Sequence, residues 1–277
     1  MNIITLNKEN ITAYQSMLIP DVADNIGRAD WYGIAEEQGR GTLVFRCNSV
    51  KGKGEMFFFT ASDAKTADAL LTEYEDRLCN AGITESELEL PLTLGSIEQE
   101  ALDRKGYRLS TGESRILRTT VAYLAALPVA ARGELPQTIG STGALSIRQF
   151  QQAIRKKQKA DISEEVQIHS PAWFDQVLSC YVQIKGKICG CLLIHRMPSG
   201  AYHPELFRIT EPASTNDLLN MIRYVIFRAQ EQLSGDTPIV ISRLSERTRA
   251  LTDKLLPGLQ GDTILAAVKE ISKKGND

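Results

Sequence analysis

The sequence predicts an α/β protein of the mixed α+β kind, built from two tandem units that share one architecture. Residues recur at a spacing of about 149 positions. The clearest case is the segment Ser96–Lys105, which shares a serine, an alanine, a leucine and a lysine with Ser245–Lys254. Strand-like and helix-like stretches also follow each other in the same order in both halves. Such a repeat indicates two copies of one folded unit, and 277 residues are enough for each copy to bury a core.

The stretch between the two copies has a different composition from either of them. It contains two prolines and three glycines, and few large apolar residues follow Val129. Proline and glycine interrupt regular structure, and such segments are commonly exposed. The sequence therefore predicts an N-terminal domain at 1–125, an exposed linker at 126–143 and a C-terminal domain at 144–277.

Hydrophobic periodicity predicts each element of the first copy. Apolar residues at helical spacing indicate helices, and short β-branched or aromatic runs indicate strands. Glycines at 39 and 41 predict a hairpin turn, while Gly82 and Gly106 mark the ends of two helices. The predicted elements are a helix at 10–24, strands at 31–37, 42–47 and 55–60, a helix at 66–80, a strand at 87–92, a helix at 96–105 and a strand at 114–124.

The second copy repeats this order. Its hairpin turn is predicted at 185–187, where a glycine lies between two lysines. Its long helix has apolar residues along one face. The predicted elements are a helix at 148–159, strands at 179–184, 188–195 and 205–210, a helix at 216–233, a strand at 238–243, a helix at 245–255 and a strand at 263–271.

Composition and charge exclude several classes of function. A net charge of −2 gives no general attraction to nucleic acid or to anionic membranes, and the basic run at 155–159 is interpreted as a solvated helix face. Five cysteines without a C-x-x-C pair predict neither a disulfide framework nor a zinc site, and the three histidines are too scattered to predict a metal centre. Without a signal peptide or a long apolar stretch, the sequence predicts a cytoplasmic protein with no membrane segment.

The repeated order of elements resembles that of the GNAT superfamily of acyl-CoA N-acetyltransferases. The likeness covers nearly the whole chain, twice. Three features carry it: a glycine in the second hairpin strand (Gly41 and Gly190), a strand that leads directly into a long helix, and the segment Lys105-Gly106-Tyr107 at the end of the short helix. The resemblance implies two GNAT-like domains that use acetyl-CoA and a small-molecule amine or a peptide acceptor, without a metal.

The acyl-CoA signature of that family, R/Q-x-x-G-x-G/A, is missing from both copies. The corresponding segments, 61–66 and 211–215, contain no glycine, although close approach of backbone N–H groups to the diphosphate requires it. Asp63 and Glu211 place negative charge there, and Pro212 has no N–H to donate. We therefore expect acetyl-CoA to bind weakly, with an affinity no better than high micromolar. Thr66, and either Ser214 or Thr215, are interpreted as helix N-caps.

The resemblance also implies a general base on the strand before the long helix. Glu55 and Glu205 lie near the start of the two matching strands, and His203 shares a face with Glu205 at i, i+2. The second copy gathers more polar groups, so Glu205 and His203 are its predicted catalytic residues. The sequence alone groups no serine with a histidine and a carboxylate. The cofactor contacts implied by the resemblance are Arg208, Thr210, Ser214, Thr215 and Asn216.

These observations leave two functions open. The first is an acyl-CoA-dependent N-acetyltransferase that acts on an unknown amine and has a degenerate cofactor loop. The second is a catalytically inactive protein that keeps the GNAT fold as a binding or scaffolding module. The general activity of proteins with this fold favours the first function, and the missing glycines favour the second.

Overall fold

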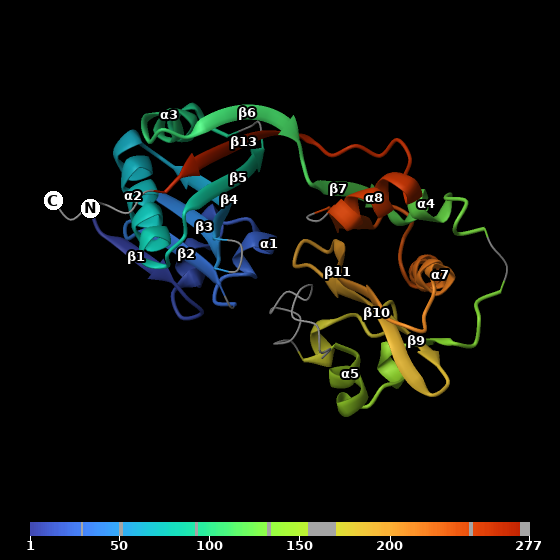
Figure 1. Ribbon diagram of the computed structural model, residues 1–277. Coiled ribbons are helices and arrows are strands. Elements are labelled where there is room, and N and C mark those ends of the chain that lie inside the picture. Colours follow the sequence, from blue (N-terminus) through green and yellow to red (C-terminus); the bar gives the residue numbers. More distant parts are fainter. Residues whose placement is uncertain are drawn as a thin grey trace. The chain divides into compact units, whose positions relative to one another are not determined.

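The computed structural model describes residues 1–28, 30–49, 52–91, 94–131, 134–154, 170–243 and 246–271, which form two compact units (Figure 1). Unit 1 combines Met1–Ser114 with Asp262–Asp277, and unit 2 is Arg115–Gly261. Among the described residues, no helix is both long and apolar enough to cross a bilayer. The basic run at 155–159 lies outside the described residues.

Unit 1 is built on a mixed sheet, sheet A, whose described strands follow the order β1-β2-β3-β4-β5-β13-β6. Neighbouring strands are antiparallel except β4 and β5, which run parallel. The predicted hairpin and the predicted strand before the long helix are therefore confirmed. The strands are β1 (Ile3–Leu6), β2 (Trp31–Glu36), β3 (Gly41–Asn48), β4 (Lys53–Ala61), β5 (Glu85–Pro91), β6 (Arg108–Glu113) and β13 (Thr263–Glu270).

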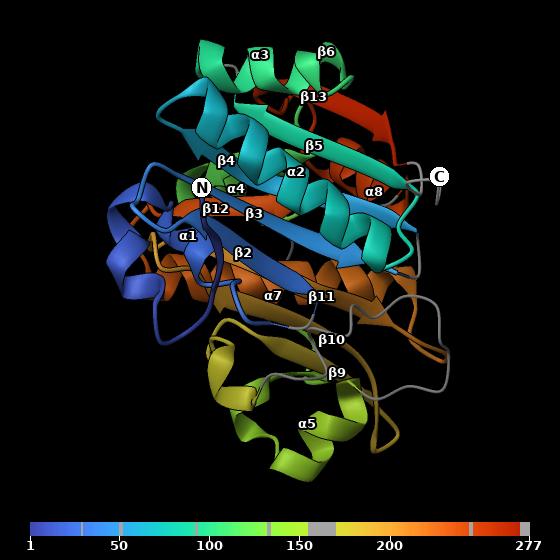
Figure 2. The ribbon, with the colours of Figure 1, turned by 90° about the vertical axis from the view of Figure 1, so that its left-hand side faces the viewer.

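Helices cover both faces of sheet A. The long helix α2 (Ala64–Asn80) buries Leu70, Tyr74 and Leu78 completely, and Figure 2 shows it lying across one face of the sheet. Complete burial of such a side chain stabilises the unit by about 1.5–3 kcal/mol. The short helix α3 (Ser96–Arg104) packs on the same apolar core.

The opposite face of sheet A is covered by a 3-10 helix, η1 (Ile11–Met17), and a short α-helix, α1 (Pro20–Ala23). A single helix at 10–24 was predicted, and this prediction is wrong. Proline disfavours the helical conformation in the residue before it, and Ile19 is extended, with φ −71° and ψ 128°. The chain therefore starts a new helix at Pro20.

Unit 2 is built on a second mixed sheet, sheet B, with the described order β7-β12-β11-β10-β9-β8. Here β11 and β12 are the parallel pair, and the other neighbours are antiparallel. The strands are β7 (Ile116–Thr120), β8 (Ile139–Ser141), β9 (Cys180–Ile184), β10 (Lys187–Arg196), β11 (Tyr202–Ile209) and β12 (Pro238–Ser242).

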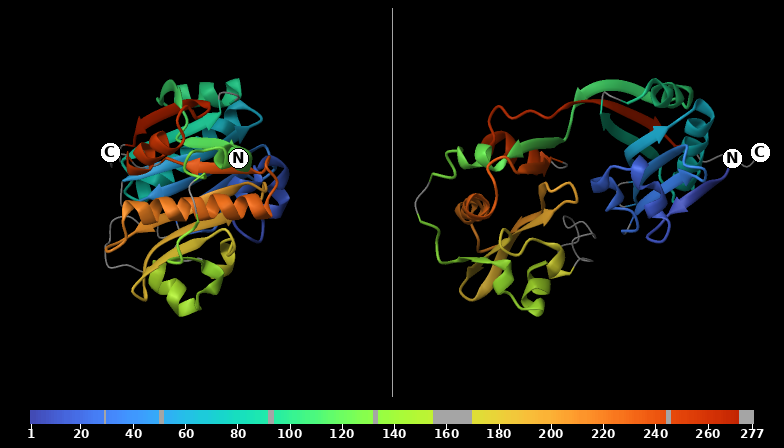
Figure 3. Two further views of the ribbon diagram at one scale, coloured as in Figure 1. Left: turned by 90° about the vertical axis from the view of Figure 1, so that its right-hand side faces the viewer. Right: turned by 180° about the vertical axis from the view of Figure 1, so that it is seen from behind.

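Sheet B also has helices on both faces, as Figure 3 shows for α7 (orange) and α5 (yellow-green). The long helix α7 (Thr215–Gln232) buries Met221 and Tyr224 against one face. On the other face, α5 (Ile147–Ile154) contributes two buried side chains to a separate core. The remaining helices are α4 (Val121–Ala125), α8 (Glu246–Leu255) and the 3-10 turns η2 (Thr142–Ala144) and η3 (Pro171–Trp173).

The two halves of the chain exchange their last strands. The predicted final strand of the first copy, 114–124, becomes β7 and α4, and β7 pairs with β12 of sheet B. The final strand of the second copy, β13, instead lies between β5 and β6 in sheet A (Figure 1). The compact units are therefore divided after Ser114 and before Asp262, which differs from the predicted limits. Strand patterns repeat in both halves, so the pattern does not specify which sheet a strand joins.

The predicted linker at 126–143 contributes to unit 2. Leu127 and Val129 are buried beside α7 and α8, and β8 pairs with β9 at the edge of sheet B. The apolar residues of this segment therefore contact the core of unit 2, while Ala131, Glu134, Gln137, Thr138 and Gly143 are exposed. The sequence also gave no indication of β6, a mostly exposed strand with little apolar content.

Candidate functional site

In each unit the parallel strand pair separates after its first residues. In sheet A, β4 and β5 pair from Lys53–Glu85 to Met56–Leu88. In sheet B, the described residues of β11 and β12 pair only at Tyr202. Beyond that position no ladder of sheet B joins the facing edges of these two described strands. Unit 2 therefore has the longer opening at this point of the fold.

A β-bulge lies at the same position of both openings. In β11, Leu206 and Pro204 pair with consecutive residues of β10, which leaves Glu205 as the extra residue. In β4 the matching irregularity leaves Phe57 as the extra residue. Bulges bend a strand and redirect a side chain. The structural repeat thus places an aromatic ring in unit 1 where unit 2 has a carboxylate.

The predicted catalytic residues His203 and Glu205 are in contact. His203 Nδ1 lies 3.0 Å from Glu205 Oε1, with side-chain exposures of 16% and 20%. The other ring nitrogen, Nε2, lies 2.8 Å from the hydroxyl oxygen of Ser242, at the end of β12. With the proton on Nδ1, the imidazole donates to Glu205 and accepts from Ser242. Sequence reasoning missed Ser242, which lies 39 residues from His203.

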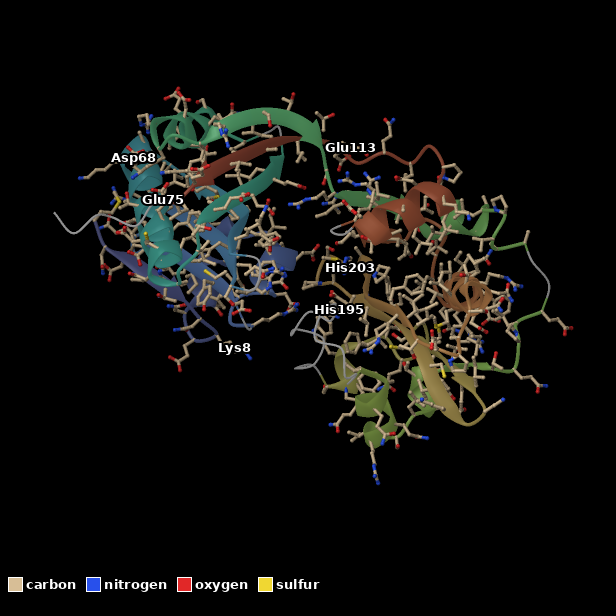
Figure 4. All side chains as sticks on the ribbon, in the orientation of Figure 1. Lys8, Asp68, Glu75, Glu113, His195 and His203 are labelled. Carbon is tan, nitrogen blue, oxygen red and sulfur yellow. The ribbon has the colours of Figure 1, made fainter. Side chains whose placement is uncertain are left out.

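His195 lies opposite His203 on the neighbouring strand β10 (Figure 4). Its ring stacks on Trp173 with centroids 3.6 Å apart, and its Nδ1 lies 2.9 Å from the carbonyl oxygen of Trp173. These contacts hold η3 against the end of β10. They give His195 a structural role, apart from the polar group around His203.

An apolar cavity of about 170 Å³ lies between sheet B and the helices α4, α7 and α8. Residues of both β11 and β12 line it. Apart from Tyr202, Ser242, Thr248 and Thr252, its lining residues are apolar. Ser242 both lines the cavity and contacts His203. The cavity and the polar group therefore meet at Ser242.

The N-terminus of α7 is closed by its own side chains. Ser214 is the N-cap: its hydroxyl accepts from the N–H of Asp217, and the Asp217 carboxylate accepts from the Ser214 N–H. Thr215 and Asn216 are exposed in the first turn. A carboxylate thus occupies the position where a helix N-terminus attracts an anion.

The N-terminus of α2 is closed in a similar way. Its N-cap is Asp63 and not Thr66 as predicted, because the Asp63 carboxylate accepts from both the N–H and the hydroxyl of Thr66. The hydrogen bond from the Thr66 N–H, above all, lowers the pKa of Asp63. The carboxylate therefore stays ionised and satisfies the helix end in place of an external anion.

The predicted cofactor residues do not form one group. The Arg208 guanidinium donates to the carbonyl oxygen of Ile154 in α5, 3.2 Å away. The N–H and hydroxyl of Thr210 both donate to the carbonyl oxygen of Cys189, at 2.7 and 3.0 Å. Only Ser214, Thr215 and Asn216 lie together at the start of α7.

The matching region of unit 1 is filled. Glu55, which takes the strand position of His203, forms an ion pair with Arg46 at 2.9 Å. On the neighbouring strand β5, the Ser86 hydroxyl lies 2.8 Å from the Tyr74 hydroxyl and 3.3 Å from the Tyr107 hydroxyl. Burial raises the pKa of both tyrosines, so the hydroxyls stay neutral.

Among the described residues, no three His, Cys, Asp or Glu side chains converge in a group that could hold a metal ion. The chemistry of the candidate site rests on its imidazole, carboxylate and hydroxyl.

No protein-family model matches the sequence, and no curated protein matches it. Solved structures do match. A tandem GNAT protein from the clavulanic acid biosynthesis pathway, solved without AcCoA, has a TM-score of 0.59 and 9% identity, with 98% of each chain covered. A GCN5-related N-acetyltransferase from Sphaerobacter thermophilus has a TM-score of 0.52 and 13% identity, with 97% of this chain and 96% of that chain covered.

The third neighbour is the C-terminal DUF2156 domain of a protein described as a lysylphosphatidylglycerol synthetase from Agrobacterium fabrum. Its TM-score is 0.51 at 12% identity, and the alignment covers 94% of this chain and 90% of that one. Identities this low concern the fold alone. The chain has a tandem GNAT-like α/β fold with two mixed sheets, as the sequence predicted.

Proposed function

We propose that this protein is an acyltransferase in which unit 2 transfers an acyl group from a thioester donor, such as acyl-CoA, to an amine. The observation that supports this proposal is the placement of His203 between Glu205 and Ser242, where the opening of β11 and β12 meets an apolar cavity. The tandem GNAT-like fold of solved N-acetyltransferases agrees with this class of reaction.

In this reaction His203 acts as the general base. Its neutral imidazole takes a proton from the acceptor ammonium, and Glu205 stabilises the imidazolium that results. The amine then attacks the thioester carbonyl carbon and the C–S bond breaks. The thiolate leaves with the second proton, which the amine nitrogen gives up as the amide forms. The apolar cavity excludes water beside the reacting groups, which strengthens the electrostatic contacts within the site.

A second candidate is a non-catalytic binding module that keeps the fold. The specific observation in its favour is the pair of closed helix ends: Asp63 caps α2, and Asp217 closes the cap of α7. Each carboxylate stands where a cofactor phosphate needs free N–H groups. Loss of such charge-assisted hydrogen bonds, each worth about 1.5–3 kcal/mol, weakens binding by two or more orders of magnitude.

Calorimetry measures how tightly the cofactor binds, and turnover separates the two candidates. Calorimetric titration of acetyl-CoA is expected to give a dissociation constant in the high micromolar range or weaker. Transfer to a panel of small amines, measured at millimolar acyl-CoA, is expected to be slow but detectable. His203→Gln should lower kcat by about 100-fold or more. Glu231→Gln, an exposed substitution in the same unit, should leave the rate unchanged.

Absence of turnover with every acyl-CoA and amine tested, from a protein with an intact unfolding transition, would favour the binding module. Turnover that is equal in wild type and His203→Gln would show that unit 2 does not use this base.

A further inference from the structure

We propose that Ser242, His203 and Glu205 form a nucleophile relay, and that Ser242 accepts an acyl group whose chain occupies the adjacent apolar cavity. This goes beyond the function proposed above, because the donor can be any activated ester or thioester and the relay needs no contact with CoA phosphates. The class of substrate is a carboxylic ester or thioester with an apolar chain of about six carbons.

The geometry of the three side chains supports the relay. Ser242 Oγ lies 2.8 Å from His203 Nε2, and His203 Nδ1 lies 3.0 Å from Glu205 Oε1. Both distances fall within hydrogen-bond reach for an activated nucleophile, about 2.6–3.2 Å. The carboxylate holds the proton on Nδ1, so the lone pair of Nε2 faces the hydroxyl. A serine, a base and a group that orients the base are the parts of a catalytic triad.

The relay is held by a rigid scaffold. His203 and Glu205 come from the start of β11, and Ser242 comes from the end of β12. The bulge redirects Glu205 locally, and its carboxylate contacts the imidazole. The side chains of His203 and Glu205 are each at least four-fifths buried. They are therefore largely shielded from bulk water, and Ser242 is likewise neither fully buried nor fully exposed.

The cavity indicates the acyl group. Its volume is about 170 Å³, and Ser242 is one of its few polar lining residues. An apolar cavity of about 150 Å³ stays dry and accepts benzene, which has six carbons. A six-carbon acyl chain therefore matches this space, while an acetyl group leaves most of it empty. Burial of the additional methylene groups predicts a preference of about 100-fold for a hexanoyl donor over an acetyl donor.

The reaction is a balanced group transfer with no redox step. Ser242 Oγ attacks the carbonyl carbon of the donor while its proton passes to His203 Nε2. The bond from the carbonyl carbon to the leaving sulfur or oxygen breaks, and the leaving group takes that proton. An ester of Ser242 and a free thiol or alcohol result. Water or an amine then attacks the ester with His203 as base, which regenerates the Ser242 hydroxyl.

The first experiment labels the full-length protein with a fluorophosphonate, which reacts with activated serines, and locates the adduct by peptide mass spectrometry. The expected result is one adduct, on Ser242, absent in Ser242→Ala and at least 100-fold slower in His203→Gln. Ser234→Ala is the matched control, because Ser234 is an exposed serine of the same unit that contacts Asp236. It should be labelled like wild type.

The second experiment compares hydrolysis of p-nitrophenyl hexanoate with that of p-nitrophenyl acetate. Wild type should favour the hexanoate by about 100-fold in kcat/KM. Ala229 lines the cavity, so Ala229→Leu fills part of it. This variant should lose most of the hexanoate preference.

The outcomes distinguish this inference from the proposed function. If a folded protein shows no adduct on Ser242, the relay is only a structural polar cluster and the inference is overturned. Amine acylation that persists in Ser242→Ala also overturns it, but leaves direct transfer by His203 standing. Labelling and ester hydrolysis without any turnover of acyl-CoA support the relay and count against the proposed function.

Discussion

The parallel strand pairs β4–β5 and β11–β12 take the same place in the two sheets. Buried side chains fill the space beside the pair in unit 1, whereas a cavity lies beside the pair in unit 2. In unit 1, Ser86 lies at the pairing and its hydroxyl is enclosed by two buried tyrosines. Gly54 admits this packing, because a Cβ there would lie 2.5 Å from Leu78. In unit 2 the strand position that matches Gly54 holds Tyr202, which lines a cavity.

The polar residues at one matching position of β4 and β11 also differ between the two units. Unit 1 pairs Glu55 with Arg46, an ion pair whose charges satisfy each other. Unit 2 replaces the glutamate by His203, which is held between a carboxylate and a hydroxyl. A salt bridge is a poor proton acceptor, whereas a neutral imidazole is a good one. One scaffold therefore holds a stabilising ion pair in one copy and an imidazole between a carboxylate and a hydroxyl in the other.

The largest effect is expected from separating the units. Unit 2 contains all strands of sheet B within 115–261, whereas sheet A depends on β13 from the far end of the chain. A fragment of 1–125 should therefore fail to fold, while 115–261 should fold alone. Circular dichroism and thermal unfolding of the two fragments test this expectation.

A fused fragment provides the control. The N–H of Ser114 donates to the carbonyl oxygen of Asp262, 2.8 Å away, so a short Gly-Ser linker can join 1–114 to 262–277. This fusion should restore a cooperative transition. A stable, cooperative 1–125 fragment would show that β13 is dispensable to sheet A.

The next effect comes from one substitution made at two sites. Ala67 in α2 is completely buried in the filled core of unit 1, and Ala229 in α7 lines the cavity of unit 2. Ala67→Leu should destabilise by about 1–3 kcal/mol through overpacking. Ala229→Leu should stabilise by about 0.5–2 kcal/mol through cavity filling. Urea denaturation of both variants measures the difference, and equal destabilisation by both would argue that unit 2 has no real void.

Low pH should lower the stability of unit 1 through Glu36, at the turn between β2 and β3. Glu36 is 2% exposed, and its carboxylate accepts from the Arg40 side chain and from two backbone N–H groups. The hydrogen bond from the Arg40 side chain, above all, lowers the pKa of Glu36 in the folded state. Its stabilisation is therefore present above the unfolded pKa, about 4.3, and is lost as pH falls through the lower folded pKa.

Glu36→Gln should cost about 1–3 kcal/mol at pH 7 and flatten the acid-side loss of stability. Glu37→Gln, at the exposed neighbour, is the control and should change little. The matching turn of unit 2 has Lys185 and Gly186 at positive φ and no such carboxylate. Equal acid profiles for Glu36→Gln and wild type would contradict this account.

The smallest effect concerns the contact that holds β13 to α2. Lys269 Nζ lies 2.6 Å from Glu75 Oε1, with side-chain exposures of 21% and 18% (Figure 4 labels Glu75). Lys269→Met should cost about 1 kcal/mol because the carboxylate loses its partner. Arg104→Met removes a more exposed ion pair with Asp68 and should cost about 0–0.5 kcal/mol. Denaturation midpoints that fall equally in both variants would show that this contact has no special role in docking β13.

Local sequence patterns predicted most of the elements and the two hairpin pairs, but not the partners of the last strands. The hairpins, the long helices and the strands before them follow from periodicity and turn glycines, and the structure confirms them. The exchange of β7 and β13 could not be predicted, because strand pairing depends on contacts between residues far apart in the chain. The repeat spacing of about 149 residues does not hold at the starts of the long helices. Their N-caps, Asp63 and Ser214, lie 151 residues apart, so Thr66 matches Asp217.

The candidate site could be predicted only in part. His203 and Glu205 were found because two polar residues at i, i+2 share a strand and lie in contact once the strand forms. Ser242 could not be found, because the pairing of Tyr202 with Ile239 is what brings the end of β12 near the start of β11. The cavity depends on how three helices pack on sheet B, which no local pattern specifies.

The place of β13 has a consequence for synthesis on the ribosome. Strands β5 and β6 emerge about 150 residues before the strand that joins them. At 5–20 residues per second, the facing edges of these strands wait roughly 10–30 s for their partner. Exposed strand edges invite pairing with other chains during that time. The half of the molecule that is made first is therefore completed last, and nascent chains should depend on cellular holdases until residue 270 has left the exit tunnel.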